Sequence, residues 1–191
     1  AKKGNGCLFL MKSGTLQKLV MTAGTTAIQN NSAVKNIELQ GGTLYDDVQA
    51  TRHGIHVPKG KSAEWHLTYE YYTAYENKLT GEGTLTIVPR NTVSRVRIKG
   101  DWSQFEGTIK HTNTNIWLPL DMSGGMPRGT LDLAEGCTAT NVCQEYTIGR
   151  LTGKGSLAHP VANFYGQGAV SGNNTWNIGN DDLGDFTFAG T

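Results

Sequence analysis

The sequence predicts an all-β protein, a single-stranded parallel β-helix of about seven to eight irregular coils. A glycine-centred phrase is repeated: LTGEGTL occupies residues 79–85 and LTGKGSL occupies residues 151–157. Shorter Gly-Thr or Gly-Ser phrases recur, and from Gly83 to Gly155 they follow one another at intervals of 24, 22 and 26 residues. That interval is about the length of one coil made of three short strands and their turns.

The segments between these glycines have the pattern of half-buried strands. Apolar and polar residues alternate in them, and β-branched and aromatic residues are frequent. Examples are residues 85–88, 93–98, 108–110, 174–178 and 185–188. Each segment is closed by Gly, Asn or Asp, which tolerate the left-handed backbone of tight corners. Residues 63–79 also favour strand over helix because they are rich in aromatic residues.

The glycine rhythm also predicts which aliphatic residues face inward. One from each coil is expected to stack in a single inward column. The members of this column are Leu16, Leu44, Leu85, Ile109, Leu131 and Leu157. The same short strands and turns fit an antiparallel β-sandwich or jelly roll, which is the alternative fold.

Composition excludes several classes of function. Charged residues make up 17% of the chain and the net charge is +1, so there is no electrostatic argument for nucleic-acid binding. No apolar run approaches the roughly 18–20 residues of a membrane span, so direct membrane insertion is not expected. The chain starts and stops within the repeat rhythm. We therefore expect residues 1–191 to be one β-helix segment excised from a larger protein, with open ends that favour end-to-end self-association.

Three stretches, LTGEGTLTI (residues 79–87), IKGDWSQFEGTIK (98–110) and NTWNIGNDDLGDFTFAGT (174–191), resemble autotransporter-associated β-strand repeats. The resemblance is closest at residues 100–108, GDWSQFEGT, and covers roughly residues 79–110 and 151–191. It implies a right-handed parallel β-helix that is secreted or presented at a bacterial cell surface, associated with the outer membrane. It implies a scaffold or adhesin without catalytic activity.

The chain departs from that family's rhythm at residues 45–78 and 137–150, which are expected to hold inserts. Inserts in a regular scaffold are where specific function is most often placed. Aromatic rings in the first insert could stack on sugars, with polar side chains beside them. The expected ligand-binding residues are Arg52, Trp65, Glu70, Tyr71 and Tyr72. The competing interpretation is that Trp65, Leu67, Tyr69 and Tyr71 share a face that packs in the core.

Metal and disulfide sites have weaker signals. Asp181, Asp182 and Asp185 offer oxygen ligands suited to calcium, although Asp is also an ordinary turn residue. His53 and His56 have His-x-x-His spacing, but no third ligand is evident, and a strand through Ile55 to Val57 is the plainer interpretation. Cys137 and Cys143 are spaced to close a small loop by a disulfide, and two unpaired thiols are the alternative.

No catalytic motif is present: the nucleophile elbow, the P-loop and the dinucleotide fingerprint are all missing. We therefore expect a non-enzymatic β-helix scaffold, adhesin-like, without a cofactor, that binds glycans or host surface molecules. The alternative is a polysaccharide lyase or hydrolase that uses a groove on the β-helix. Its candidate groups would be Asp46, Asp47, Glu64, Glu70 and Glu76, with Arg52 or Lys59.

Overall fold

The computed structural model describes residues 4–10, 15–29, 33–47, 53–68, 73–89, 96–122, 124–141, 143, 145–158 and 175–179. These residues form 18 strands and no helix. The strands are β1 Cys7–Leu10, β2 Thr15–Met21, β3 Thr25–Gln29, β4 Ala33–Leu39, β5 Thr43–Asp47, β6 Gly54–Val57, β7 Ser62–Leu67, β8 Thr73–Glu76, β9 Lys78–Gly81, β10 Thr84–Pro89, β11 Val96–Lys99, β12 Thr108–His111, β13 Leu118–Leu120, β14 Met126–Leu133, β15 Thr138–Asn141, β16 Glu145–Gly153, β17 Ser156–Ala158 and β18 Thr175–Ile178.

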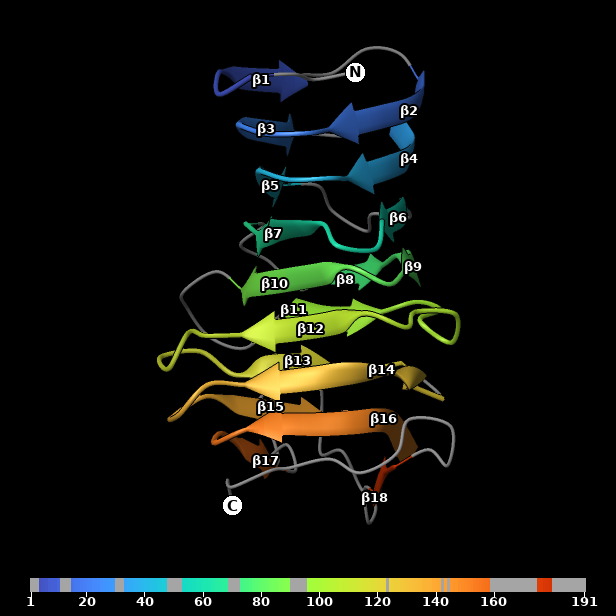
Figure 1. The fold of residues 1–191 in the computed structure, drawn as a ribbon, viewed down its shortest axis with the longest axis vertical. Helices are drawn as coiled ribbons and strands as arrows, with labels where there is room; N and C mark the ends of the chain where they lie inside the picture. Colours follow the sequence, from blue (N-terminus) through green and yellow to red (C-terminus); the bar gives the residue numbers. More distant parts are fainter. Residues whose placement is uncertain are drawn as a thin grey trace.

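The strands stack as a solenoid with three parallel sheets (Figure 1). Sheet A has the order β2-β4-β6-β9, sheet B the order β1-β3-β5-β7-β10-β12-β14-β16-β18, and sheet C the order β17-β15-β13-β11-β8. Every pairing between the described strands is parallel, and each strand pairs with the equivalent strand of the next coil. The parallel β-helix is confirmed, and the antiparallel sandwich does not describe this chain. The described strands pass through sheet B nine times, from β1 to β18.

The inward column is confirmed for part of its length. Leu85, Ile109 and Leu131 pair in register within sheet B, and the column continues to Leu151. Leu44 pairs instead with Trp65, because Glu64 N donates to Gly42 O while Thr84 N donates to Lys61 O. Leu85 pairs with Ala63, whereas Leu44 pairs with Trp65, two residues further along β7. Leu44 is therefore out of line with Leu85.

The two ends of the predicted column were wrong. Leu16 lies on β2 of sheet A and is 39% exposed, while Leu157 lies on β17 of sheet C. Both follow a Gly-Ser or Gly-Thr phrase, so the phrase does not always open a strand of the same sheet. Alternation within the strands is regular even so: β10 buries Leu85, Ile87 and Pro89 and leaves its threonines partly exposed.

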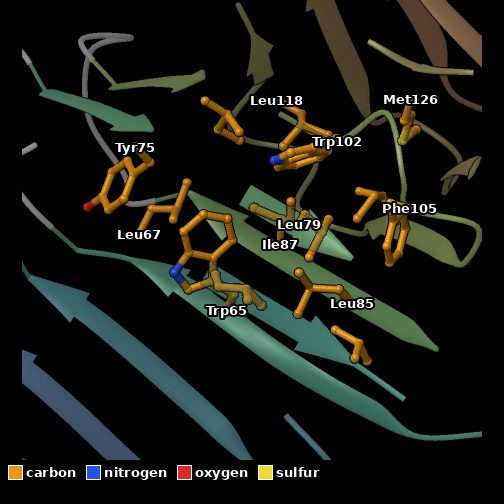
Figure 2. Close-up of a cluster of buried hydrophobic side chains, with 14 of the residues drawn as sticks. Trp65, Leu67, Tyr75, Leu79, Leu85, Ile87, Trp102, Phe105, Leu118 and Met126 are labelled. Carbon is orange, nitrogen blue, oxygen red and sulfur yellow. The ribbon is translucent and has the colours of Figure 1, made fainter. Parts of the chain in front are cut away.

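Large aromatic side chains fill the space between the sheets (Figure 2). Trp65 is fully buried and meets Tyr75 edge to face, with ring centroids 5.7 Å apart. Its indole Nε1 donates to Asp46 Oδ2 at 3.1 Å, and Tyr75 Oη donates to the Asp46 carbonyl at 3.0 Å. Trp65 is therefore core and cannot stack on a sugar at the surface, as the competing interpretation held. Its indole N–H has a partner, which makes the burial of this polar group inexpensive.

The two copies of the glycine phrase form the same corner. Gly81 and Gly153, their first glycines, have φ of 109° and 100°. Gly83 and Gly155, their second glycines, each donate their N–H to a carbonyl of the preceding coil. The acceptors are Val57 O at 3.0 Å and Leu133 O at 3.1 Å. The corners nevertheless join different sheets. The first connects β9 of sheet A to β10 of sheet B, and the second connects β16 of sheet B to β17 of sheet C.

The two segments expected to hold inserts contain strands of the solenoid. β6, β7 and β8 lie within residues 45–78, and β15 and the start of β16 lie within residues 137–150. Cys137 and Cys143 are free thiols, so the expected disulfide is not formed in this structure. The extended strand β15 separates them and spans about 10 Å from its first to its last Cα, whereas a disulfide needs Cα atoms within about 7 Å.

A candidate binding notch on sheet A

The outer face of sheet A carries two neighbouring ladders of side chains, one residue from each coil. The first ladder is Lys18, Asn36, Gly54 and Lys78, and the second is Val20, Glu38, His56 and Thr80. Successive members of a ladder lie about 4.8 Å apart, because that is the spacing of paired strands. Gly54 has no side chain, so the first ladder is interrupted at its third position.

An open hollow of about 420 Å³, which we call the notch, lies at this interruption of the ladder. It is lined by Lys18, Asn36, Ile37, Glu38, Gly54, Ile55, His56, Lys78 and Thr80. This volume is within the range of small-ligand sites, and the lining combines charged, amide, hydroxyl and imidazole groups. The notch faces outward from sheet A, and the pairing of β2, β4, β6 and β9 fixes the backbone positions from which its side chains project.

Glu38 is held in its ionised form at one side of the notch. Lys18 Nζ lies 2.7 Å from Glu38 Oε2, and Gln40 Nε2 donates to Glu38 Oε1 at 2.5 Å. These two bonds keep the pKa of Glu38 below its ordinary value. The carboxylate is therefore an acceptor and not a proton donor near neutral pH.

His56 is exposed and is oriented by the next coil. Its Nδ1 lies 3.0 Å from Thr80 Oγ1, and Thr80 Oγ1 is also 3.4 Å from the carbonyl of Ile55. A hydroxyl has one proton, so when it donates to Ile55 it accepts from His56 Nδ1–H. The neutral imidazole then keeps a lone pair on Nε2, which is turned away from this bond.

Lys78 closes the other side of the notch and forms a long ion pair with Asp101. Its Nζ is 3.8 Å from Asp101 Oδ2, which is too long for a hydrogen bond. Asp101 Oδ1 is occupied by Ser103, through its N–H at 3.1 Å and its hydroxyl at 2.6 Å. These two bonds are the largest cause of the lowered pKa of Asp101. Among the described residues, Lys78 therefore has donors that no acceptor takes up.

This arrangement offers polar groups that can bind a polar ligand. Glu38 is the single carboxylate among the described residues that line the notch. Hydrolysis of a glycosidic bond by the usual mechanism needs two carboxyl groups on opposite sides of the scissile bond. The notch instead offers acceptors at Glu38 and His56, donors at Lys78 and the amide of Asn36 between them.

Among the residues that the structure describes, none of the sequence-predicted site residues lines the notch. Trp65 is in the core, and Arg52, Glu70, Tyr71 and Tyr72 lie outside the described residues, as do Asp181, Asp182 and Asp185. Asp46, one of the candidate acids, is buried beside Trp65, and Glu64 lies on sheet B, 2.9 Å from His66 Nε2. Within the described part of the chain, no cluster of three or more His, Cys, Asp or Glu side chains is arranged to hold a metal ion. That part also has no helix that could cross a membrane.

Sequence reasoning missed the residues of the notch. His56 was recognised as part of a strand, but Lys18, Glu38 and Lys78 were not expected to lie beside it. It also missed an aromatic contact on sheet B, where Tyr45 and His66 are ladder neighbours with ring centroids 4.6 Å apart. The only signal that could have found either group is the register between coils, which depends on the length of every turn.

Comparisons of this chain with protein-family models, with curated proteins and with solved structures found no match.

Proposed function

We propose that this chain is a non-enzymatic β-solenoid scaffold, secreted or presented at a bacterial cell surface, that binds glycans in the notch on sheet A in the manner of an adhesin. The observation that carries this proposal is the interruption of a polar ladder at Gly54. It provides a hollow of about 420 Å³ on an otherwise continuous sheet face.

The groups around the notch favour a sugar over an apolar ligand. A sugar ring presents hydroxyls that both donate and accept, and the notch supplies both functions. Glu38 accepts, the amide of Asn36 can do either, and Lys78 donates. Asn36 Nδ2 donates to Gln17 O at 3.3 Å, and in this orientation the amide oxygen faces Gly54. Because the sheet fixes the backbone of these residues before a ligand arrives, only their side chains have to be ordered on binding.

Membership of the autotransporter-associated repeat family is part of the proposal, and the roles of residues 100–108 support it. In this phrase Gly100 turns the chain with φ of 121°, Asp101 accepts from Ser103, and Trp102 and Phe105 are fully or nearly fully buried. The residues of the phrase thus either turn the chain or pack in the core beside that turn. If a repeat family is built from such corners, we expect the same phrase to recur at each of them.

A polysaccharide binding array on the purified chain, followed by product analysis on every hit, tests the proposal. The wild type is compared with Gly54→Thr, which places a side chain at the gap in the ladder and is a residue that favours strands. Thr108→Val, on the outer face of sheet B, is the matched control. We expect binding without product, lost at least tenfold in Gly54→Thr and retained in Thr108→Val.

Two results would overturn the proposal. Binding that survives in Gly54→Thr would place the ligand elsewhere on the molecule. Release of product from a bound polysaccharide would replace the scaffold with a lyase or hydrolase.

A further inference from the structure

We infer that the notch selects a uronate-containing glycan, with the sugar carboxylate bound by Lys78; this inference rests on the proposed function. It starts from the different states of the two lysines at the notch. Lys18 lies 2.7 Å from Glu38 and is neutralised by it, whereas Lys78 has only the 3.8 Å approach of Asp101. Lys78 is therefore the ammonium group that is available to an anionic ligand.

The position of Lys78 sets where the carboxylate would lie. Lys78 is the ladder neighbour of Gly54, so its Cα is about 4.8 Å from the centre of the gap. Asn36 Oδ1 lies over Gly54 itself, so the carboxylate would lie on the Lys78 side of the gap, within reach of the flexible lysine side chain. A charge-assisted hydrogen bond between ammonium and carboxylate is roughly twice as strong as one between neutral groups.

The second ladder limits how much negative charge the ligand can carry. Glu38 is the ladder neighbour of His56 and is ionised, so a second anionic group on that side would be repelled. A sugar hydroxyl there can donate a hydrogen bond to Glu38 or to His56 Nε2. The notch therefore favours one carboxylate per ring with hydroxyls on the opposite edge, and it disfavours a densely sulfated chain.

The competing carboxylate of Asp101 does not block this assignment. Its side chain is 54% exposed, and its Oδ1 is bonded to Ser103. An exposed ion pair at this distance contributes little, so a ligand carboxylate that approaches Lys78 directly replaces a weak contact with a closer one.

The test compares oligogalacturonate with the same oligosaccharide after methyl esterification of its carboxyl groups, by titration calorimetry. This pair removes the charge and keeps the sugar chain. The protein is compared as wild type, Lys78→Gln, Lys78→Arg and Lys110→Gln. Lys110, on sheet B, is the matched control because it is a similarly exposed lysine, 3.6 Å from Asp132. Thermal unfolding of each variant is measured in parallel.

We expect the wild type to bind the acid at least tenfold more tightly than the ester, with affinity that falls as salt is added. Lys78→Gln should lose this preference, while Lys78→Arg and Lys110→Gln should keep it. Equal binding of acid and ester would overturn the uronate inference and leave glycan binding standing. Preference for the acid that persists in Lys78→Gln would overturn the role of Lys78. Absence of binding to every glycan on the array would overturn the proposed function itself.

Discussion

Glycine does two different things in two regions of this molecule, the corners of the coils and the notch on sheet A. At the corners, Gly81 and Gly153 have φ of 109° and 100°, which L-residues rarely adopt. In the notch, Gly54 has ordinary strand geometry, so its backbone does not require glycine. Gly81 and Gly153 are therefore needed to form the corners of the solenoid. Gly54 is not needed by the backbone, and its lack of a side chain leaves space on the surface.

The corner glycines and Gly54 also differ in the atoms that an added Cβ would contact. At Gly81 it would lie 2.1 Å from Val57 O, and at Gly153 it would lie 2.0 Å from Leu133 O. Both are backbone atoms of the preceding coil. At Gly54 the nearest atom is Asn36 Oδ1 at 2.7 Å, the end of a side chain that can rotate away. The corner glycines therefore set the distance between coils, and the notch glycine does not.

The largest expected effect follows from the corners. Gly81→Ala and Gly153→Ala should each destabilise the fold by about 3–5 kcal/mol, because the strained φ and the overlap with the adjacent coil add together. The free energy of unfolding from urea denaturation measures this loss. The two substitutions should cost similar amounts although they lie in corners between different sheets, since the local geometry is the same.

A cost below about 1 kcal/mol at either corner would contradict the view that these glycines hold neighbouring coils at contact distance. A large cost at one corner only would show that the repeated phrase has a different role in its two copies.

Histidines also occur in two environments, the core and the outer face of sheet A. His53 and His111 point inward and are almost fully buried, and burial is the largest cause of the lowered pKa of each. His111 Nε2 lies 2.8 Å from Ile116 O, and its Nδ1 lies 3.4 Å from Ile87 O. A neutral ring has one N–H, which donates to the closer carbonyl. The core thus favours the neutral form of both rings.

The second prediction is that the fold loses stability as the pH falls below about 6.5, the ordinary histidine value. The unfolded chain takes up protons there, while the folded pKa values are lower, so acid favours unfolding. Above that pH the contribution of both rings is fully present. Urea midpoints at pH 7.5, 6.5 and 5.5 measure the slope, and these values stay above the range in which carboxylates dominate.

His111→Gln keeps an N–H that can donate to Ile116 O and removes the titrating group. It should flatten the dependence of the midpoint on pH, as should His53→Asn. A wild-type midpoint that rises between pH 7.5 and 5.5 would mean that the buried rings gain protons on folding, the opposite of what their burial implies.

The sequence predicted the corners well and the notch not at all, and the reason is physical. Gly81 and Gly153 belong to local phrases whose turn chemistry acts within a few residues, and the alternation that buries Leu85, Ile109 and Leu131 is equally local. The notch depends on Lys18, Glu38, Gly54 and Lys78 meeting across four coils. Their register is the sum of all the turn lengths between them, and a two-residue shift such as that in β7 realigns a whole ladder.

The smallest expected effect is at the notch and completes the comparison. Gly54→Ala should change the free energy of unfolding by less than about 1 kcal/mol, and it could raise it, because alanine restricts the unfolded chain and suits a strand. Asn36 must rotate and give up its exposed bond to Gln17 O, which contributes little. The same urea denaturation that measures Gly153→Ala measures this change. A loss as large as that of Gly153→Ala would mean that Gly54 is needed for the fold, and the notch would then be a by-product of packing between coils, with no reason to regard it as a site.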